Sequence, residues 1–116
     1  MIVTFTEKAI SAIKNRYNMS SDTACLQLFY DIEGCGCGVN GVPVFKEIKE
    51  PGSNIIQITS NWGRIYLHTQ QAVFFPENMI VDYYEKSSHL QLKSKEEMVN
   101  PHIQIEKYKQ EDQYEK

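Results

Sequence analysis

The first regular pattern of apolar positions in the chain is that of an amphipathic helix over residues 7–17. Ile10, Ile13 and Tyr17 recur at spacings of three and four, which places them on one face of a helix. Thr6 stands where an N-cap residue is expected, and Glu7 puts a negative charge in the first turn. Thr4 is an alternative cap, because it forms a capping-box pattern with Glu7. The pattern predicts one short helix near the N-terminus.

The period of the apolar positions changes to two after residue 25. Leu26, Leu28, Tyr30 and Ile32 alternate with more polar residues, which is typical of a strand with one buried face. Further extended runs follow, separated by turn signals rich in Gly, Pro, Asn and Ser, at residues 42–48, 55–59, 64–68, 79–85, 90–93 and 102–106. Seven short strands at this spacing predict a mainly β domain whose strands are predominantly antiparallel.

Two other segments complete the expected organisation. Residues 69–75 read as a single helical turn, because Thr69 can cap it and Pro76 cannot continue it. The last ten residues, 107–116, hold too little apolar material to be buried and are expected to form a polar tail. Residues 1–106 are therefore expected to form a single domain.

Composition and charge narrow the classes of function. A chain of 116 residues with 41% hydrophobic and 23% charged residues fits one globular domain. The formal charge of −3 offers no basic field for a phosphate backbone, so nucleic acid is not an expected partner. No run approaches the roughly 18 apolar residues of a membrane span, and no signal peptide is evident. With three cysteines, an odd number, the chain is expected to be cytoplasmic and its cysteines reduced.

The strongest chemical signal is a glycine-rich stretch that carries two cysteines. Four of the six glycines lie between residues 34 and 41, around Cys35 and Cys37. Glycine frees the backbone there, and a Cys-x-Cys loop can bring two sulfurs to the separation of about 4 Å that a tetrahedral ion requires. The residues therefore suit bis-thiolate metal binding, although a plain hairpin loop that tolerates two cysteines explains the same pattern.

Two thiolates do not complete a metal shell, which usually has four ligands. The remaining ligands would come from Cys25, a histidine, an external thiol or a second subunit. In a symmetric homodimer two such loops would supply four thiolates. Cys25 itself begins a strand and is expected to be an inert, buried or half-buried thiol.

The other residues with functional chemistry give weaker signals. His68, His89 and His102 lie far apart in sequence without His-x-His spacing, so each is expected at the surface or at a strand edge. Trp62, at a hairpin tip, is either an exposed contact for a partner or an aromatic ring folded back onto the sheet.

Nothing in the sequence points to an enzyme. The glycine run lacks the lysine and the following helix of a phosphate-binding loop. Asp31 and Glu33 precede the cysteines, and acids beside a thiolate raise its pKa and disfavour nucleophilic catalysis. These two acids either help to hold a harder ion such as ferrous iron or are solvated residues at the strand end.

The order of several short motifs resembles the HesB-like, or A-type, iron-sulfur cluster biosynthesis family over residues 1–105. The first motif is a short extended segment that leads into a helix, at residues 2–9, and the second is a Leu-x-Leu strand, Leu26 to Leu28, that runs into Gly34-Cys35-Gly36. A tetrapeptide, Ile80-Val81-Asp82-Tyr83, and a dipeptide, Asn100-Pro101, follow later in the chain. The resemblance implies a compact, sandwich-like fold of two packed β-sheets with one short helix. It also implies a role in carrying iron or a nascent cluster.

The resemblance extends to one of the three cysteines that this family uses. Cys35 matches the cysteine of the family's glycine-flanked loop. The other two form a Cys-Gly-Cys pair shortly after the segment that corresponds to Asn100-Pro101, and this chain has no cysteine there. Cys37 compensates for the missing pair if Cys35 and Cys37 together bind iron or a labile cluster.

Three hypotheses follow from the sequence. In the first, the protein is an iron-sulfur assembly accessory protein that binds iron or a cluster through Cys35 and Cys37 and delivers it to apoproteins. In the second, it is a metal-free relative that docks on the assembly machinery through its surface. In the third, the two cysteines cycle between a dithiol and a strained disulfide.

Overall fold

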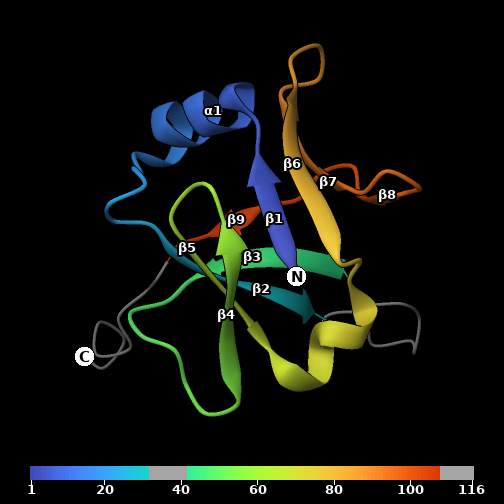
Figure 1. Ribbon diagram of the computed structural model, residues 1–116. Helices are drawn as coiled ribbons and strands as arrows, with labels where there is room; N and C mark the ends of the chain where they lie inside the picture. The colour runs from blue at the N-terminus through green and yellow to red at the C-terminus, as the bar shows by residue number, and fades with distance from the viewer. Residues whose placement is uncertain (32–41, 108–116) are drawn as a thin grey trace.

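The computed structural model describes residues 1–31 and 42–107, which form one curled β-sheet with an α-helix and a 3-10 helix on opposite sides (Figure 1). The elements are, in chain order, β1 (Ile2–Phe5), α1 (Glu7–Tyr17), β2 (Cys25–Asp31), β3 (Val42–Glu47), β4 (Ile55–Ser60), β5 (Arg64–His68), the 3-10 helix η1 (Thr69–Phe74), β6 (Asn78–Tyr84), β7 (His89–Lys93), β8 (Met98–Asn100) and β9 (Ile105–Glu106). The strand order is β8-β7-β6-β1-β4-β5-β2-β3-β9.

The sheet is mixed and continuous, so the expected sandwich of two sheets and about seven strands is wrong in its arrangement. β1 pairs in parallel with both β4 and β6 and thereby joins the two halves of the chain in one sheet. β2 also pairs in parallel with β5, and β3 with β9, so the predominantly antiparallel pairing that we expected is wrong as well. The mainly β class with one N-terminal helix is confirmed.

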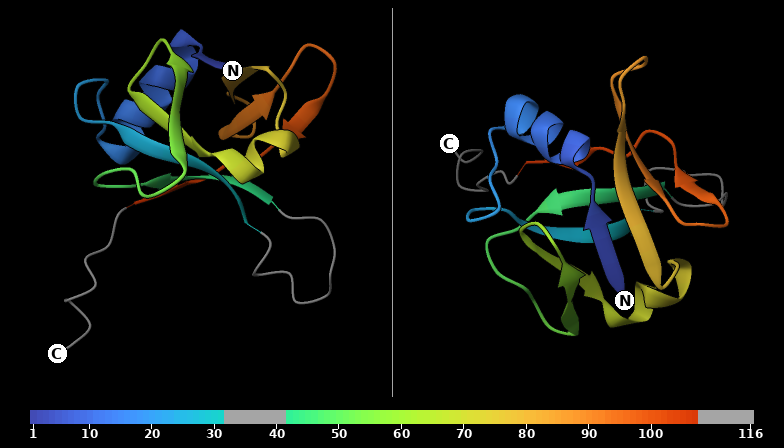
Figure 2. Two further views of the ribbon diagram at one scale, coloured as in Figure 1. Left: turned by 60° about the horizontal axis from the view of Figure 1, so that its bottom comes forward. Right: turned by 45° about the horizontal axis from the view of Figure 1, so that its top comes forward.

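The helix predicted over residues 7–17 is confirmed. The Thr6 hydroxyl accepts a hydrogen bond from the backbone N–H of Ala9 at 3.1 Å, which identifies Thr6 as the N-cap. Asn18 ends the helix in the left-handed conformation, with φ of 59°. Ala9 and Ile13 are fully buried against the sheet. Figure 2 shows α1 and η1 on opposite sides of the curled sheet.

The helical turn predicted over residues 69–75 is present as η1, and its cap differs from the expectation. The ring nitrogen Nδ1 of His68, not the hydroxyl of Thr69, accepts the hydrogen bond from the backbone N–H of Gln70, at 3.1 Å. Among the residues that the structure describes, no helix has the length and apolar character needed to span a membrane.

The concave side of the sheet encloses the hydrophobic core, and Trp62 belongs to it. Trp62 is 3% exposed, and its ring centroid lies 4.9 Å from that of Phe5. Phe5 in turn lies 6.0 Å from Phe45 across the interior. The indole is therefore folded back onto the sheet and is not an exposed contact.

An asparagine side chain fastens the end of β1. Asn61 Oδ1 accepts a hydrogen bond from the backbone N–H of Phe5 at 2.8 Å, and Asn61 Nδ2 donates one to the Phe5 carbonyl at 3.0 Å. β4 pairs with β1 only through Ile2 and Val3, so Asn61 supplies the next rung of hydrogen bonds. This arrangement holds the point at which β1 leads into α1.

Candidate functional site

The cysteine loop is carried by a hairpin whose two strands are well defined. β2 and β3 pair antiparallel over six residue pairs, the last of which joins Asp31 to Val42. Cys35 and Cys37, our predicted ligands, lie between these two positions and outside the described residues, as does Glu33. The structure therefore fixes where the loop leaves and rejoins the sheet.

The end of β2 is held in place by η1. The side-chain amide of Gln71 accepts a hydrogen bond from the Tyr30 N–H at 3.0 Å and donates one to the Tyr30 carbonyl at 3.3 Å. The Tyr30 ring stacks on Phe74, with centroids 4.5 Å apart, and meets Phe75 edge-on at 6.0 Å. Tyr30, the last residue but one of β2, is thus restrained through both its backbone and its ring.

Apolar surface is exposed beside this anchor. Val73 is 81% exposed and Phe74 is 52% exposed, although Phe74 stacks on Tyr30. Val42, the first residue of β3, is 52% exposed. Large apolar side chains at this level of exposure are a feature of contact surfaces, since each one loses favourable burial when it faces water. We call Val73 and Phe74 the η1 patch.

A small cavity of about 160 Å³ lies on the other side of the hairpin, where β3 meets the segment that follows β8. The Asn100 side chain crosses this junction, because its Nδ2 donates to the Pro43 carbonyl at 2.9 Å and its Oδ1 accepts from the His102 N–H at 3.0 Å. The residues that line the cavity are Val42, Pro43, Val44, Asn100, His102, Gln104 and Glu106. The Asn100-Pro101 motif therefore joins the two ends of the curled sheet.

Two histidines that are far apart in sequence meet at the same junction. The rings of His89 and His102 lie parallel, with centroids 3.7 Å apart and an angle of 6° between their planes. Each histidine was expected singly at a surface or strand edge, and no sequence spacing announced the pair. Parallel rings direct their in-plane nitrogen lone pairs side by side, so the two nitrogens do not converge on one ion.

The remaining predicted residues are not brought together. Cys25 is 5% exposed at the start of β2, as expected for a buried thiol. His68 caps η1 on the opposite side of the sheet from the helix α1. Within residues 1–31 and 42–107, no three His, Cys, Asp or Glu side chains form a group that could hold a metal ion.

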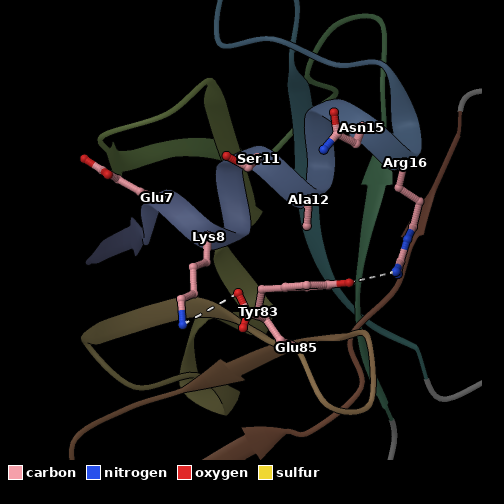
Figure 3. Close-up of a pocket in the computed structure, with 8 residues that line it drawn as sticks. All are labelled: Glu7, Lys8, Ser11, Ala12, Asn15, Arg16, Tyr83 and Glu85. Atoms are coloured by element: carbon pink, nitrogen blue, oxygen red, sulfur yellow. Dashed lines mark hydrogen bonds and ion pairs between the residues drawn. The ribbon is translucent and has the colours of Figure 1, made fainter.

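A larger cavity, of about 660 Å³, is an open groove between α1 and β6 (Figure 3). The Tyr83 ring runs along it, and its hydroxyl lies 3.4 Å from Arg16 Nη2. Lys8 and Glu85 form a long ion pair of 3.8 Å across the groove, and both side chains are about two-thirds exposed. Such exposed pairs contribute little to stability.

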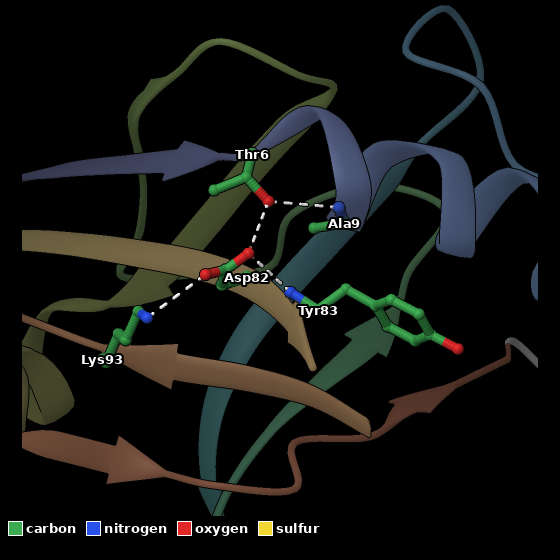
Figure 4. A network of polar contacts seen from close by, with 5 residues as sticks. All are labelled: Thr6, Ala9, Asp82, Tyr83 and Lys93. Atoms are coloured by element: carbon green, nitrogen blue, oxygen red, sulfur yellow. Dashed lines mark hydrogen bonds and ion pairs between the residues drawn. The ribbon is translucent and has the colours of Figure 1, made fainter. Parts of the chain in front are cut away.

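Asp82 connects the helix N-terminus to the β6–β7 hairpin (Figure 4). Its Oδ1 accepts hydrogen bonds from the Thr6 hydroxyl at 2.9 Å and from the Tyr83 N–H at 2.8 Å, and its Oδ2 pairs with Lys93 Nζ at 3.2 Å. Burial raises the pKa of Asp82, but these hydrogen bonds and the charge of Lys93 outweigh it and leave the pKa below its usual value. The network therefore links the N-cap of α1 to β6 and β7.

Comparison with known proteins gives a family for this arrangement. The family model for iron-sulphur cluster biosynthesis matches residues 1–107, and the chain belongs to that family. The resemblance that the sequence motifs indicated is thereby confirmed. The matched range includes the hairpin, the η1 patch and the Asn100 junction.

Particular relatives agree with this assignment. The uncharacterized protein YqkB of Bacillus subtilis (strain 168) is 36% identical over 105 residues, which cover 90% of this chain and 97% of YqkB. A Lactobacillus acidophilus protein assigned to Fe-S biosynthesis has a similar crystal structure, with a TM-score of 0.72, 19% identity and coverage of 92% of this chain and 90% of that one.

Two further crystal structures share the fold. A Lactobacillus salivarius protein, also assigned to Fe-S biosynthesis and described as having a novel fold, gives a TM-score of 0.69 at 19% identity, covering 95% of this chain and all of that one. Escherichia coli SufA, involved in biosynthesis of iron-sulfur clusters, gives 0.51 at 16% identity, covering 78% and 76% of the two chains. At these identities the likeness shows the fold alone.

Proposed function

We propose that this protein is an iron-sulfur cluster assembly accessory protein that binds iron or a labile cluster through Cys35 and Cys37 and passes it to recipient apoproteins. The metal is the cargo, and the partners are the assembly machinery and the recipients, in the cytoplasm. The observation that carries the proposal is the match to the iron-sulphur cluster biosynthesis family. The matched range, residues 1–107, contains Cys35-Gly36-Cys37 of this chain.

The scaffold around the loop supports this function. A metal or cluster that is to be transferred needs thiolates that a recipient can reach. The loop that carries these thiolates also needs to be held by a rigid part of the fold. The loop is closed by the Asp31–Val42 pair, and Gln71 and Phe74 restrain Tyr30 just before it. Two thiolates from one chain leave positions on the metal for a second copy of the protein or for the recipient's own ligands.

The η1 patch favours a second candidate function. Val73 and Phe74 expose apolar surface next to the anchored end of β2, which suits contact with another protein. A family member that has no metal cargo and acts only as a docking module would use this surface. Binding of cargo separates the two functions.

The test is anaerobic reconstitution of the reduced protein with ferrous iron and sulfide, followed by desalting, visible spectroscopy and analysis of iron and sulfide. We expect retained iron and sulfide with visible absorbance in the wild type. The Cys35→Ser, Cys37→Ser double variant should retain neither, whereas Cys25→Ala, which removes the buried third thiol, should retain both. Transfer is then measured by mixing with an apo-ferredoxin and separating the two proteins.

The outcomes separate the candidates. Equal iron content in the wild type and in the double variant would overturn binding through Cys35 and Cys37. No retained iron in any variant would favour the docking module. Retained cluster that never moves to the apo-ferredoxin would contradict delivery but not binding.

A further inference from the structure

The stacked pair of His89 and His102 lies at a place where the fold is closed. His89 is the first residue of β7, and His102 lies on the chain that crosses from β8 to β9. This crossing segment connects opposite ends of the strand order, since β8 and β9 are the two outermost strands. The contact between the rings therefore spans the junction of the sheet's two ends.

The crossing segment is held on both sides, since the Phe45 N–H donates to the Gln104 carbonyl at 2.9 Å. The Ile103 N–H donates to the Leu90 carbonyl at 2.9 Å, and the Ile103 side chain is 1% exposed. The Asn100 side chain donates to the Pro43 carbonyl at 2.9 Å. The His89–His102 stack is a further contact, and it differs from the hydrogen bonds in being made by two ionisable rings.

The described residues near the two rings include one phenol and one carboxylate. Tyr84 faces His89 across the β6–β7 register, and Glu106 lines the same cavity as His102. In the described part of the chain, no carboxylate forms an ion pair with either imidazole. Beside His89 in the chain, the Ser88 carbonyl accepts a hydrogen bond from the Arg16 guanidinium at 3.0 Å.

The protonation states of the stack differ in energy. Two neutral rings stack through dispersion, and a single protonated ring over a neutral one is also attractive. Two protonated rings place like charges 3.7 Å apart. Even at the dielectric constant of water, the repulsion at that separation lowers the ratio of stacked to separated rings by about sixfold.

We propose that the His89–His102 stack is an acid-sensitive closure, which holds the crossing segment on β7 near neutral pH and releases it when both rings are protonated. Release frees residues 100–103 from Leu90 and opens the cavity beside Val42. His89 remains in place, because the Ser88 carbonyl is bound by Arg16 from α1. The moving partner is His102. The proposal does not depend on whether the protein carries iron.

The test is amide hydrogen exchange of the intact protein at pH 7.5 and pH 5.0, corrected for the intrinsic rate. The reporter is the Ile103 amide, and the reference is the Thr6 amide, which donates to the Val81 carbonyl away from the stack. In the wild type, we expect the protection of Ile103 relative to Thr6 to fall by about sixfold or more at pH 5.0. The His102→Phe variant keeps a flat ring without a titrating group and should lose this response.

Two further variants keep the result interpretable. His89→Phe removes the other titrating ring and should behave like His102→Phe. His68→Gln removes the histidine that caps η1 and should keep the wild-type response. The proposal is overturned if Ile103 protection in the wild type does not change with pH, or if both phenylalanine variants retain the change. If a phenylalanine variant does not fold, His102→Gln with the same reporter decides.

Discussion

The side-chain amide of Gln71 takes the place of a neighbouring strand beside Tyr30. The parallel pairing of β2 with β5 ends at Leu28 and Leu67, so Tyr30 has no strand on that side. Gln71 Oε1 and Nε2 bind the Tyr30 N–H and carbonyl instead, at 3.0 Å and 3.3 Å. A primary amide can do this because it presents one donor and one acceptor, as a peptide group does.

The loss of this amide should weaken the fold at the start of the cysteine loop. In Gln71→Leu, the partly buried N–H and carbonyl of Tyr30 lose their partner, so we expect the free energy of unfolding to fall by about 1–3 kcal/mol. Urea denaturation followed by circular dichroism measures the change. Gln70→Leu, at the exposed neighbouring position, should change it far less. Equal losses would show that the amide does not act as a strand partner.

Gly63 should not tolerate a side chain. Its φ is +68°, and a Cβ there would lie 2.8 Å from the Cβ of Ala24, which cannot rotate away. We expect Gly63→Ala to cost about 1–3 kcal/mol from the left-handed backbone and the overlap together. The matched control is Gly52→Ala, where nothing lies within 4 Å of the added methyl group. Thermal denaturation of both variants tests this, and similar melting temperatures would contradict it.

Trp62 should act as a buried reporter of folding. It is the single tryptophan, and its position against Phe5 predicts blue-shifted native emission with little quenching by iodide. Trp62→Ala should lower the free energy of unfolding by about 3–5 kcal/mol, and Trp62→Phe by less, because the cavity is smaller. Strong iodide quenching of the native protein would contradict the buried position.

Asp82 should make stability depend on acid. Its pKa is lowered in the folded state, so its contribution is present above about pH 4 and is lost as the pH falls through the folded value. We expect Asp82→Asn to be less stable than the wild type at pH 7, by at most about 1 kcal/mol because the pair with Lys93 is partly exposed, and the deficit to shrink as the pH falls from about 4 toward 2. Urea unfolding at pH 7 and near pH 2 checks this, with the exposed Asp22→Asn as the control. A deficit that persists unchanged in acid would contradict it.

Local patterns were sufficient for the parts of the fold that form from neighbouring residues. The helix over residues 7–17 and the turn over residues 69–75 follow from apolar spacing, capping and the position of Pro76, and both are confirmed. The six strands at residues 26–32, 42–48, 55–59, 64–68, 79–85 and 90–93 coincide closely with observed strands, because extended runs with apolar residues are bounded there by turn signals. The confirmed resemblance to the family rests in part on motifs in these segments, Leu26 to Leu28 and Ile80-Val81-Asp82-Tyr83.

Non-local pairing accounts for what the sequence did not reveal. β1 has four residues and β8 has three, too few for a period to be evident, and the expected strand at residues 102–106 contracts to Ile105–Glu106. The curled sheet arises because β1 pairs with β6 more than seventy residues away, which no local pattern encodes. The site shows the same limit, since the His89–His102 stack and the Gln71–Tyr30 bonds join residues from separate elements.

The central position of β1 also sets the order in which the protein can be completed. Ile2 pairs with Asn78 and Phe5 with Val81, so β1 has no partner on that side until more than seventy further residues have been synthesised. Long-range parallel pairing of this kind carries a large loop-closure entropy and is slow. The β2–β3 hairpin, which carries the cysteine loop, needs only local contacts and is free to form well before β1 is inserted between β4 and β6.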